Sequence, residues 1–153
     1  MVDEHKQKWD FSQIEEFVFL GADLCCGYEH YEYLVKEMKV VADINLRREE
    51  KLLPSSLLGS YLWLPVINNR SPSQHQFEVG AAFIDAVVKR EERVFIHCMY
   101  GHGRSPALLA GYYVLKQGLS VDAAVKKIKA ARAEVHPTLD QMEGLYKLAG
   151  EKK

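Results

Sequence analysis

The ten residues HCMYGHGRSP, at positions 97–106, combine a cysteine, two glycines, an arginine and a proline. The residues before them, RVFI (93–96), predict a short buried strand, and PALLAGYYVLKQG (106–118) predicts a helix. The segment is therefore expected to be a tight loop between the end of a strand and the N-terminus of a helix.

The thiol of Cys98 is the candidate nucleophile of this loop. A cysteine that leads into a helix N-terminus lies among backbone N–H groups and near the positive end of the helix dipole, and both favour the thiolate. We therefore expect the pKa of Cys98 to lie below the value of a free cysteine, about 8.5. The alternative is a small buried hydrophobic residue at a strand end, which the glycines and Arg104 disfavour.

The rest of the loop is suited to binding phosphate. Gly101 and Gly103 permit turns in which successive backbone N–H groups surround an anion. Arg104 offers a planar guanidinium that binds two phosphoryl oxygens at once. Ser105 can donate a hydrogen bond to the cysteine sulfur, which would help it leave, or it can serve as N-cap of a helix that begins at Pro106. A nucleophile beneath a phosphate cradle predicts attack on phosphorus.

The flanking sequence predicts an α/β domain. Apolar runs rich in β-branched and aromatic residues, typical of strands, alternate with segments of helical period. The predicted strands are 15–22, 39–46, 60–66 and 93–98. Helices are expected over 74–90, capped by Ser73 with Gln76, over 106–118, over 120–133, and over 138–149, opened by Thr138 with Gln141.

The composition fits one globular domain over residues 1–153, with its core at about 15–149. The 20 basic and 21 acidic residues are interspersed, so no basic stripe favours nucleic acid or an anionic membrane. No apolar run is long enough to cross a bilayer. The three cysteines, Cys25, Cys26 and Cys98, do not suggest a secreted disulfide framework, and we expect a cytoplasmic protein.

The loop resembles the signature of the cysteine-dependent protein tyrosine phosphatases, His-Cys-x5-Arg-Ser, and the short chain looks like their compact dual-specificity type. The similarity runs from about Phe17 to Leu148. It implies a central mixed β-sheet flanked by helices. It also implies Cys98 as nucleophile and Arg104 as phosphate ligand and transition-state stabiliser. The phosphate is expected to contact the whole loop, which comprises Met99, Tyr100, Gly101, His102, Gly103 and Arg104.

Three supporting positions have two interpretations each. The resemblance implies that His97 holds the loop and the thiolate, whereas a buried histidine could simply satisfy a backbone carbonyl. Gln141 matches a glutamine that orients water in relatives, but as the third residue of a capping box it also has a sufficient structural role. Cys25 and Cys26 are either packing residues or partners of Cys98 in a protective disulfide.

One position departs from the family pattern. Aligning LPVINNRSPSQHQF (64–77) on that pattern places Asn68 where relatives have the aspartate that protonates the leaving oxygen. Asparagine cannot give up a proton, and a positioned acid contributes about 10²- to 10⁴-fold. Four explanations are open. His75, Glu78 or a water donates the proton, or the substrate has a leaving group that needs no proton, as in RNA 5′-triphosphatases. Alternatively, the chain is a phosphate-binding pseudophosphatase, or it carries a substituted residue at position 68.

The sequence favours an active phosphatase because Cys98, Arg104 and Ser105 are all present. We expect a shallow pocket that accepts phosphotyrosine, with phosphoserine and phosphothreonine as further candidates, on a protein or on a small phosphomonoester. The loop has no lysine, which disfavours inositol phosphates. A phospholipid substrate is the alternative implied by the resemblance. No metal or cofactor is indicated, and RREEK (47–51) is interpreted as a solvated turn.

Overall fold

A computed structural model describes residues 9–22, 28–49 and 56–151 of the chain. These residues form a five-stranded sheet with the strand order β1-β2-β5-β3-β4. The strands are β1 (Phe11–Glu15), β2 (Val18–Gly21), β3 (Val40–Arg47), β4 (Ser60–Val66) and β5 (Arg93–His97). Strand β1 pairs antiparallel with β2, and every other pairing is parallel. The predicted mixed α/β sheet is therefore confirmed.

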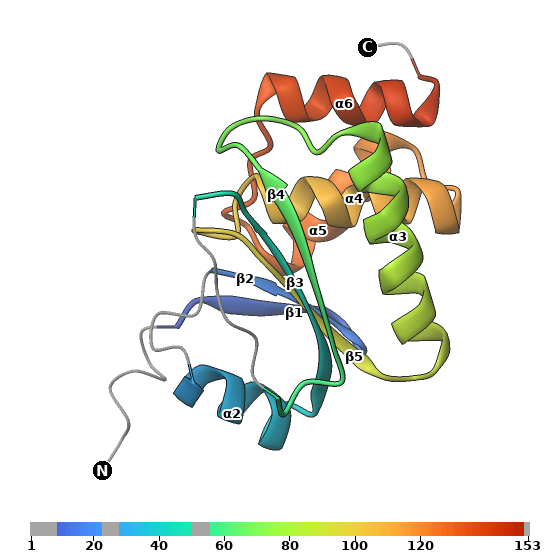
Figure 1. The fold of residues 1–153 in the computed structure, drawn as a ribbon. Coiled ribbons are helices and arrows are strands. Elements are labelled where there is room, and N and C mark those ends of the chain that lie inside the picture. The colour runs from blue at the N-terminus through green and yellow to red at the C-terminus, as the bar shows by residue number, and fades with distance from the viewer. Residues whose placement is uncertain (1–8, 23–27, 50–55, 152–153) are drawn as a thin grey trace.

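Helices cover both faces of this sheet (Figure 1). The helices are α2 (Tyr28–Lys36), α3 (Gln74–Lys89), α4 (Arg104–Gln117), α5 (Val121–Ala131) and α6 (Leu139–Ala149). Helix α2 lies on one face, and α3 to α6 lie on the other. Alternate residues of each strand point to opposite faces, so Val94 and Ile96 of β5 join the core beneath the four helices while Phe95 faces α2.

Helices α3 and α4 pack closely because two glycines remove the side chains between them. A Cβ on Gly80 would lie 2.7 Å from Leu108 Cδ1, and a Cβ on Gly111 would lie 2.5 Å from Phe77 Cδ1. This contact fixes α4 against α3, and the loop that follows β5 leads into the N-terminus of α4. The position of the loop therefore depends on core packing as well as on its own sequence.

The predicted capping boxes are confirmed at two helices. Ser73 accepts a hydrogen bond from the Gln76 amide at the start of α3, and the Gln76 side chain accepts one from the Ser73 amide. Thr138 and Gln141 form the same reciprocal pair at the start of α6. Gly118 ends α4 in the left-handed conformation, at φ 68°. These local signals placed the helix ends within about two residues.

Two elements were absent from the sequence prediction, β1 and α2. The predicted strand over 15–22 is interrupted by a turn, so the chain forms the hairpin β1–β2 in its place. Helix α2 has only nine residues, YEHYEYLVK, and most of them are polar or aromatic. No described helix is long and apolar enough to cross a membrane.

Candidate active site

The candidate site lies where three neighbouring parallel strands end. Cys98 follows β5 directly, Glu49 lies just beyond β3, and Asn68 lies just beyond β4. Strand β5 is paired with β2 on one side and β3 on the other, so it is central in the sheet. Ligands of open α/β sheets bind outside the carboxyl ends of such central strands. The fold thus brings residues from three separate segments to one place.

The thiol of Cys98 is buried, with 3% of the residue exposed. Its Sγ atom lies 3.2 Å from the hydroxyl oxygen of Ser105. Burial raises the pKa of Cys98, but hydrogen bonds from the Ser105 hydroxyl and from the amides of Ser105 and Gly101, with the charge of Arg104, outweigh it and leave the pKa below its ordinary value. The direction agrees with the sequence expectation, and a lowered pKa makes the thiolate available for attack.

The loop carbonyls point away from the sulfur because other groups bind them. Arg132, which is buried, donates from Nε to the carbonyl of Gly101 at 3.0 Å and from Nη2 to the carbonyl of Tyr100 at 2.9 Å. The His136 amide donates to the carbonyl of His102 at 2.9 Å. With three successive carbonyls turned outward, the amides of the same peptide units face the opposite way. This arrangement can bind an anion.

Gly101 cannot be replaced without disturbing the loop. Its φ of +71° belongs to the left-handed region, and a Cβ would lie 2.6 Å from the carbonyl carbon of Gly21 in β2. Gly103 has a φ of −128°, and its place is set instead by the side chain of Gln141, whose Oε1 would lie 3.0 Å from an added Cβ. The two glycines of the motif are therefore needed for different reasons. Gly101 allows a left-handed backbone conformation, and Gly103 leaves space for the side chain of Gln141.

Arg104 is held by two groups that leave one edge of its guanidinium available. Its Nη1 donates to Glu49 Oε2 and to the carbonyl of Val66, and its Nη2 donates to Glu49 Oε1, each at 2.9 Å. These bonds use three of the five N–H groups of arginine. The Nε–H and the second Nη2–H form the edge that can bind two phosphoryl oxygens.

Glu49 was missed by the sequence analysis, which interpreted RREEK (47–51) as a solvated turn. Glu49 is exposed, as that interpretation expects, but its carboxylate also pairs with both terminal nitrogens of Arg104 and contacts Arg47 Nε at 3.1 Å. The hydrogen bond with Arg104 is the main reason that the pKa of Glu49 falls to about 2. The motif itself contains no signal for this partner, which lies 55 residues away in the chain.

Ser105 is not the N-cap of the following helix, contrary to one of the two sequence interpretations. Helix α4 begins at Arg104 and its N-cap is Gly103, which offers no side-chain hydrogen bond. The helix therefore starts two residues before Pro106. Because Ser105 already lies in the first turn, its hydroxyl is free to contact the sulfur of Cys98.

His97 is fully buried behind the loop, and a carboxylate holds it there. Its Nε2 lies 3.1 Å from Asp43 Oδ2 and 3.0 Å from Oδ1, and Tyr31 donates its hydroxyl to Oδ2 at 3.0 Å. All three side chains have 2% exposure or less. The sequence analysis considered a backbone carbonyl as the partner of His97 and did not identify Asp43 or Tyr31. This buried chain fixes the last residue of β5, next to Cys98.

Two cavities adjoin the loop and share Asn68 and Met99. The first, called here the nucleophile cavity, has a volume of about 190 Å³. It is lined by Asn68, Asn69, Cys98, Met99, Tyr100, His102, Gly103, Arg104, His136, Thr138 and Gln141. Asn68 and Gln141 therefore both reach the space around the sulfur, as their predicted positions require.

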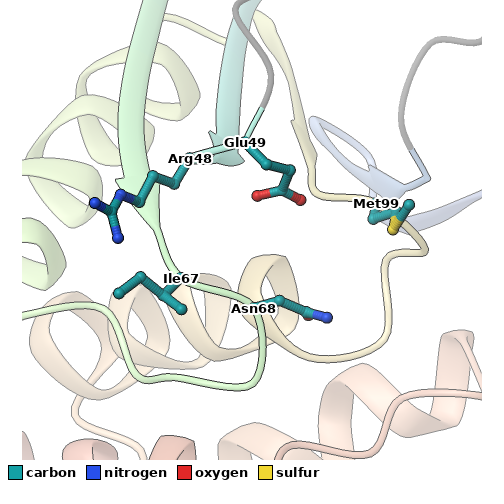
Figure 2. A pocket seen from close by; sticks show the side chains of 5 residues that line it. All are labelled: Arg48, Glu49, Ile67, Asn68 and Met99. Carbon is teal, nitrogen blue, oxygen red and sulfur yellow. The ribbon is translucent and has the colours of Figure 1, made fainter.

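The second cavity, called here the side cavity, has a volume of about 550 Å³ and is lined by Arg48, Glu49, Ile67, Asn68 and Met99 (Figure 2). Figure 2 shows these side chains on three loops around one open space, with Arg48 on the opposite side from Met99. Ile67 and Met99 are 51% and 38% exposed. The side cavity is thus an apolar surface beside the phosphate position.

The remaining predicted residues are either held by structural contacts or lie away from the cavities. The side chain of Gln141 is used by the loop before α6, because its Oε1 accepts from the Thr138 amide and its Nε2 donates to the carbonyl of Arg70. His75 and Glu78 are exposed on α3 and are not among the residues that line either cavity. Cys25 and Cys26 lie outside the described residues. Within the described ranges, no group of acidic, histidine and cysteine side chains could hold a metal ion.

The site thus combines a buried thiol with a lowered pKa and an arginine with an available edge. Residues 24–150 match the family "Dual specificity phosphatase, catalytic domain", and the chain belongs to that family. The human dual specificity protein phosphatase 5 is 30% identical over 141 residues, which are 91% of this chain and 35% of that protein. The Arabidopsis thaliana phosphatidylglycerophosphate phosphatase PTPMT1 is 29% identical over 133 residues, 83% of this chain and 38% of that protein.

Solved structures share the fold. The structure of PTPMT1 in complex with PI(5)P has a TM-score of 0.82 at 21% identity and covers 92% of this chain and 94% of its own. Human DUSP28 has a TM-score of 0.79 at 21% identity, with coverage of 92% and 93%. The chain spans little more than a third of the length of the two curated relatives named above. The predicted family and fold are confirmed.

Proposed function

We propose that this chain hydrolyses phosphomonoesters through a cysteinyl-phosphate intermediate formed on Cys98. The observation that carries the proposal is the sulfur of Cys98, 3.2 Å from the Ser105 hydroxyl and within the cavity that Arg104 also lines. The domain over residues 1–153 would act as one catalytic unit. We infer this activity from the residues of this chain.

In the first step the Cys98 thiolate attacks phosphorus, and the bond from phosphorus to the leaving oxygen breaks. The inward loop amides and the free edge of Arg104 bind the non-bridging oxygens, where charge is spread in the transition state. Because these donors are fixed by Arg132, His136 and Glu49 before substrate arrives, little reorganisation is needed during the reaction.

In the second step a water attacks phosphorus and the bond from phosphorus to sulfur breaks. The departing sulfur carries a negative charge, and the Ser105 hydroxyl lies close enough to donate a hydrogen bond to it. Gln141 would support this step indirectly, because its side chain binds the amide of Thr138, which lines the cavity, and the carbonyl of Arg70. Inorganic phosphate is then released and the thiolate is restored.

We assign phosphotyrosine as the main substrate and phosphoserine and phosphothreonine as poorer ones, on a protein or a small phosphomonoester in the cytoplasm. The nucleophile cavity is small, about 190 Å³, and it is bordered by the exposed side chains of Met99 and Tyr100. An aromatic ring attached to the phosphate would contact these two residues. The interspersed charges of the chain give no reason to expect nucleic acid as a partner.

A phospholipid phosphomonoester is the second candidate substrate. The side cavity favours it, because Ile67 and Met99 offer apolar surface next to the phosphate position and Arg48 offers a cation beyond them. Two relatives carry the name phosphatidylglycerophosphate phosphatase. The ratio of kcat/KM for a short-chain phosphatidylglycerophosphate to that for a phosphotyrosyl peptide decides between the candidates.

The proposed function is tested by Cys98→Ser. We expect turnover of an aryl phosphate to fall below detection, because a serine hydroxyl in this site is a far weaker nucleophile than a thiolate. Tungstate, an oxyanion shaped like phosphate, should still bind, since the loop amides and Arg104 remain. Retained catalysis in Cys98→Ser would exclude the thiolate mechanism. A parent chain that binds phosphopeptide without hydrolysing it would instead be a pseudophosphatase.

A further inference from the structure

The site contains no carboxylic acid at the position that relatives use for proton donation. Asn68 lines both cavities, and its amide has no proton to give at neutral pH. The two side chains that the sequence suggested as substitutes, His75 and Glu78, do not line the nucleophile cavity. A leaving oxygen of high basicity needs a proton, so hydrolysis of such a substrate requires another donor beside Cys98.

Two histidines border the nucleophile cavity, His102 of the loop and His136 of the segment before α6. Their ring centroids are 5.1 Å apart, and the His136 amide donates to the His102 carbonyl. The backbone contact therefore fixes the position of His136 relative to the loop that carries Cys98. The sequence analysis treated His102 only as a loop position and did not consider His136.

The hydrogen bond of His136 determines which ring nitrogen can exchange a proton. Its Nδ1 lies 2.5 Å from the carbonyl oxygen of Glu134. A carbonyl can only accept, so Nδ1 carries hydrogen and donates it. The Nε2 atom is then the one that gains or loses a proton as the ring changes charge. This is the arrangement of a histidine that acts as general acid and base at one atom.

We propose that His136 is the proton donor of the first step and the base of the second, in place of the missing carboxylic acid. This inference rests on the proposed phosphatase function. In the first step the bond from phosphorus to oxygen breaks, and the leaving oxygen takes the proton from Nε2 of the His136 imidazolium. In the second step the attacking water gives its proton to Nε2, the bond from phosphorus to sulfur breaks, and the imidazolium is restored.

The surroundings of His102 disfavour it as the ring that carries the proton. Burial lowers the pKa of His102, the positive charges of Arg132 and His136 lower it further, and Asp10 and Glu134 oppose this. Because two positively charged rings this close would repel each other, the pair binds one additional proton more readily than two. On its other side His136 borders a cavity shared with Asp122, Lys126 and Lys129 of α5.

The experiment measures kcat/KM for a series of aryl phosphates that differ in leaving-group pKa. For His136→Gln we expect a fall of about 10²- to 10⁴-fold with the most basic leaving groups, the usual contribution of a positioned acid, and little change with the most acidic ones. The basic limb of the pH profile, measured with a basic leaving group, should disappear in this variant. His75→Gln, on the exposed face of α3, is the matched control and should behave like the parent.

A second background separates proton donation from a merely structural role. In the Asn68→Asp background a carboxyl stands at the family position and can supply the proton. Adding His136→Gln should then lower kcat/KM only a few-fold. Unchanged tungstate affinity in His136→Gln excludes damage to the loop. An equal dependence on leaving-group pKa in the parent and in His136→Gln would overturn the inference and leave the proposed function standing. A parent chain without turnover or a cysteinyl-phosphate burst would overturn both.

Discussion

The residue that connects the site most directly to the rest of the chain is Arg104. Its side chain is almost fully buried, at 1% exposure, and Glu49 binds one edge of the guanidinium while the other edge faces the proposed phosphate position. An arginine held in this way loses little further freedom when substrate binds, because its orientation is already set. The partner carboxylate is therefore part of the site even though it need not touch substrate.

The charge of Glu49 persists over a wide pH range. Its pKa is lowered on folding from 4.5 to about 2, mainly by the hydrogen bond with Arg104. A carboxyl with a lowered pKa contributes stability that is fully present above its unfolded value and is lost as the pH falls through its folded value. The pair should thus remain intact until the pH drops well below 4.5. Protonation of Glu49 is therefore not expected to cause a loss of activity at milder acidity.

We predict that Glu49→Gln lowers kcat/KM about tenfold. A hydrogen bond to a charged group is worth roughly 1.5–3 kcal/mol, and we expect the lower end because the side chain of Glu49 is 41% exposed and screened by solvent. The measurement is kcat/KM for one aryl phosphate. Glu32→Gln, which removes the exposed partner of Lys36 on α2, is the control. Equal kcat/KM values for the parent and Glu49→Gln would show that Arg104 does not need the Glu49 carboxylate for catalysis.

The sequence revealed those contacts that are close along the chain. Cys98 and Ser105 are seven residues apart in one loop, and their contact was predicted from the motif. The partners of Arg104 and His97, by contrast, lie 55 and 54 residues away, in a charged turn and in the middle of a strand. Glu49 and Asp43 occur in no local pattern that distinguishes them from a solvated acid and a strand residue. Only the order of β5 and β3 in the sheet brings them to the loop.

At the scale of elements, the shape of the loop depends on the end of α5. Arg132 is the C-cap residue of this helix, and its guanidinium binds the carbonyls of Tyr100 and Gly101 as well as both carboxylate oxygens of Asp10. One side chain therefore joins the start of the chain, the phosphate loop and α5. The sequence predicted α5 from its apolar period, but a single arginine at a helix end gave no sign of this role.

Replacing this arginine should damage both stability and anion binding. For Arg132→Met we expect the free energy of unfolding to fall by about 1–3 kcal/mol for each of the two carbonyls left without a donor. Tungstate affinity should fall with it, because the loop amides lose their fixed direction. The matched control is Arg90→Met, at the C-cap of α3, where the side chain is 73% exposed. Denaturant unfolding and tungstate titration measure the two effects, and parent-like values for both would exclude this role.

Elements were predicted well where apolar period and capping residues agreed, as in α3 and α6. The start of α4 was predicted wrongly because Ser105-Pro106 has the composition of an ordinary helix start. In the structure the helix begins earlier, at Arg104, and this places the Ser105 hydroxyl beside the sulfur. The contact of Ser105 with Cys98 thus takes the place of a capping role. The hairpin strand β1 was missed because its residues are only partly buried and do not alternate clearly.

At the scale of the whole molecule, the phosphate position is bordered by segments that follow β3, β4 and β5 and by the residues before α6. An anion in the loop would add bonds to the folded chain that the unfolded chain cannot make. Anything that binds only the folded state stabilises it by mass action. The fold and the proposed function are therefore linked, and ligand-dependent stability reports on the site without any chemical step.

We predict that tungstate raises the melting temperature of the parent chain and of Cys98→Ser alike. At a concentration 100 times its Kd the ligand adds about 2.7 kcal/mol to the free energy of unfolding, which for a domain of this size corresponds to a rise of about 5–11 °C. In Arg104→Ala most of the rise should be lost, because the guanidinium edge and its charge are gone. Differential scanning calorimetry at matched tungstate concentration compares the three chains. A full rise in Arg104→Ala would mean that tungstate stabilises the chain from a site other than the Cys98 loop.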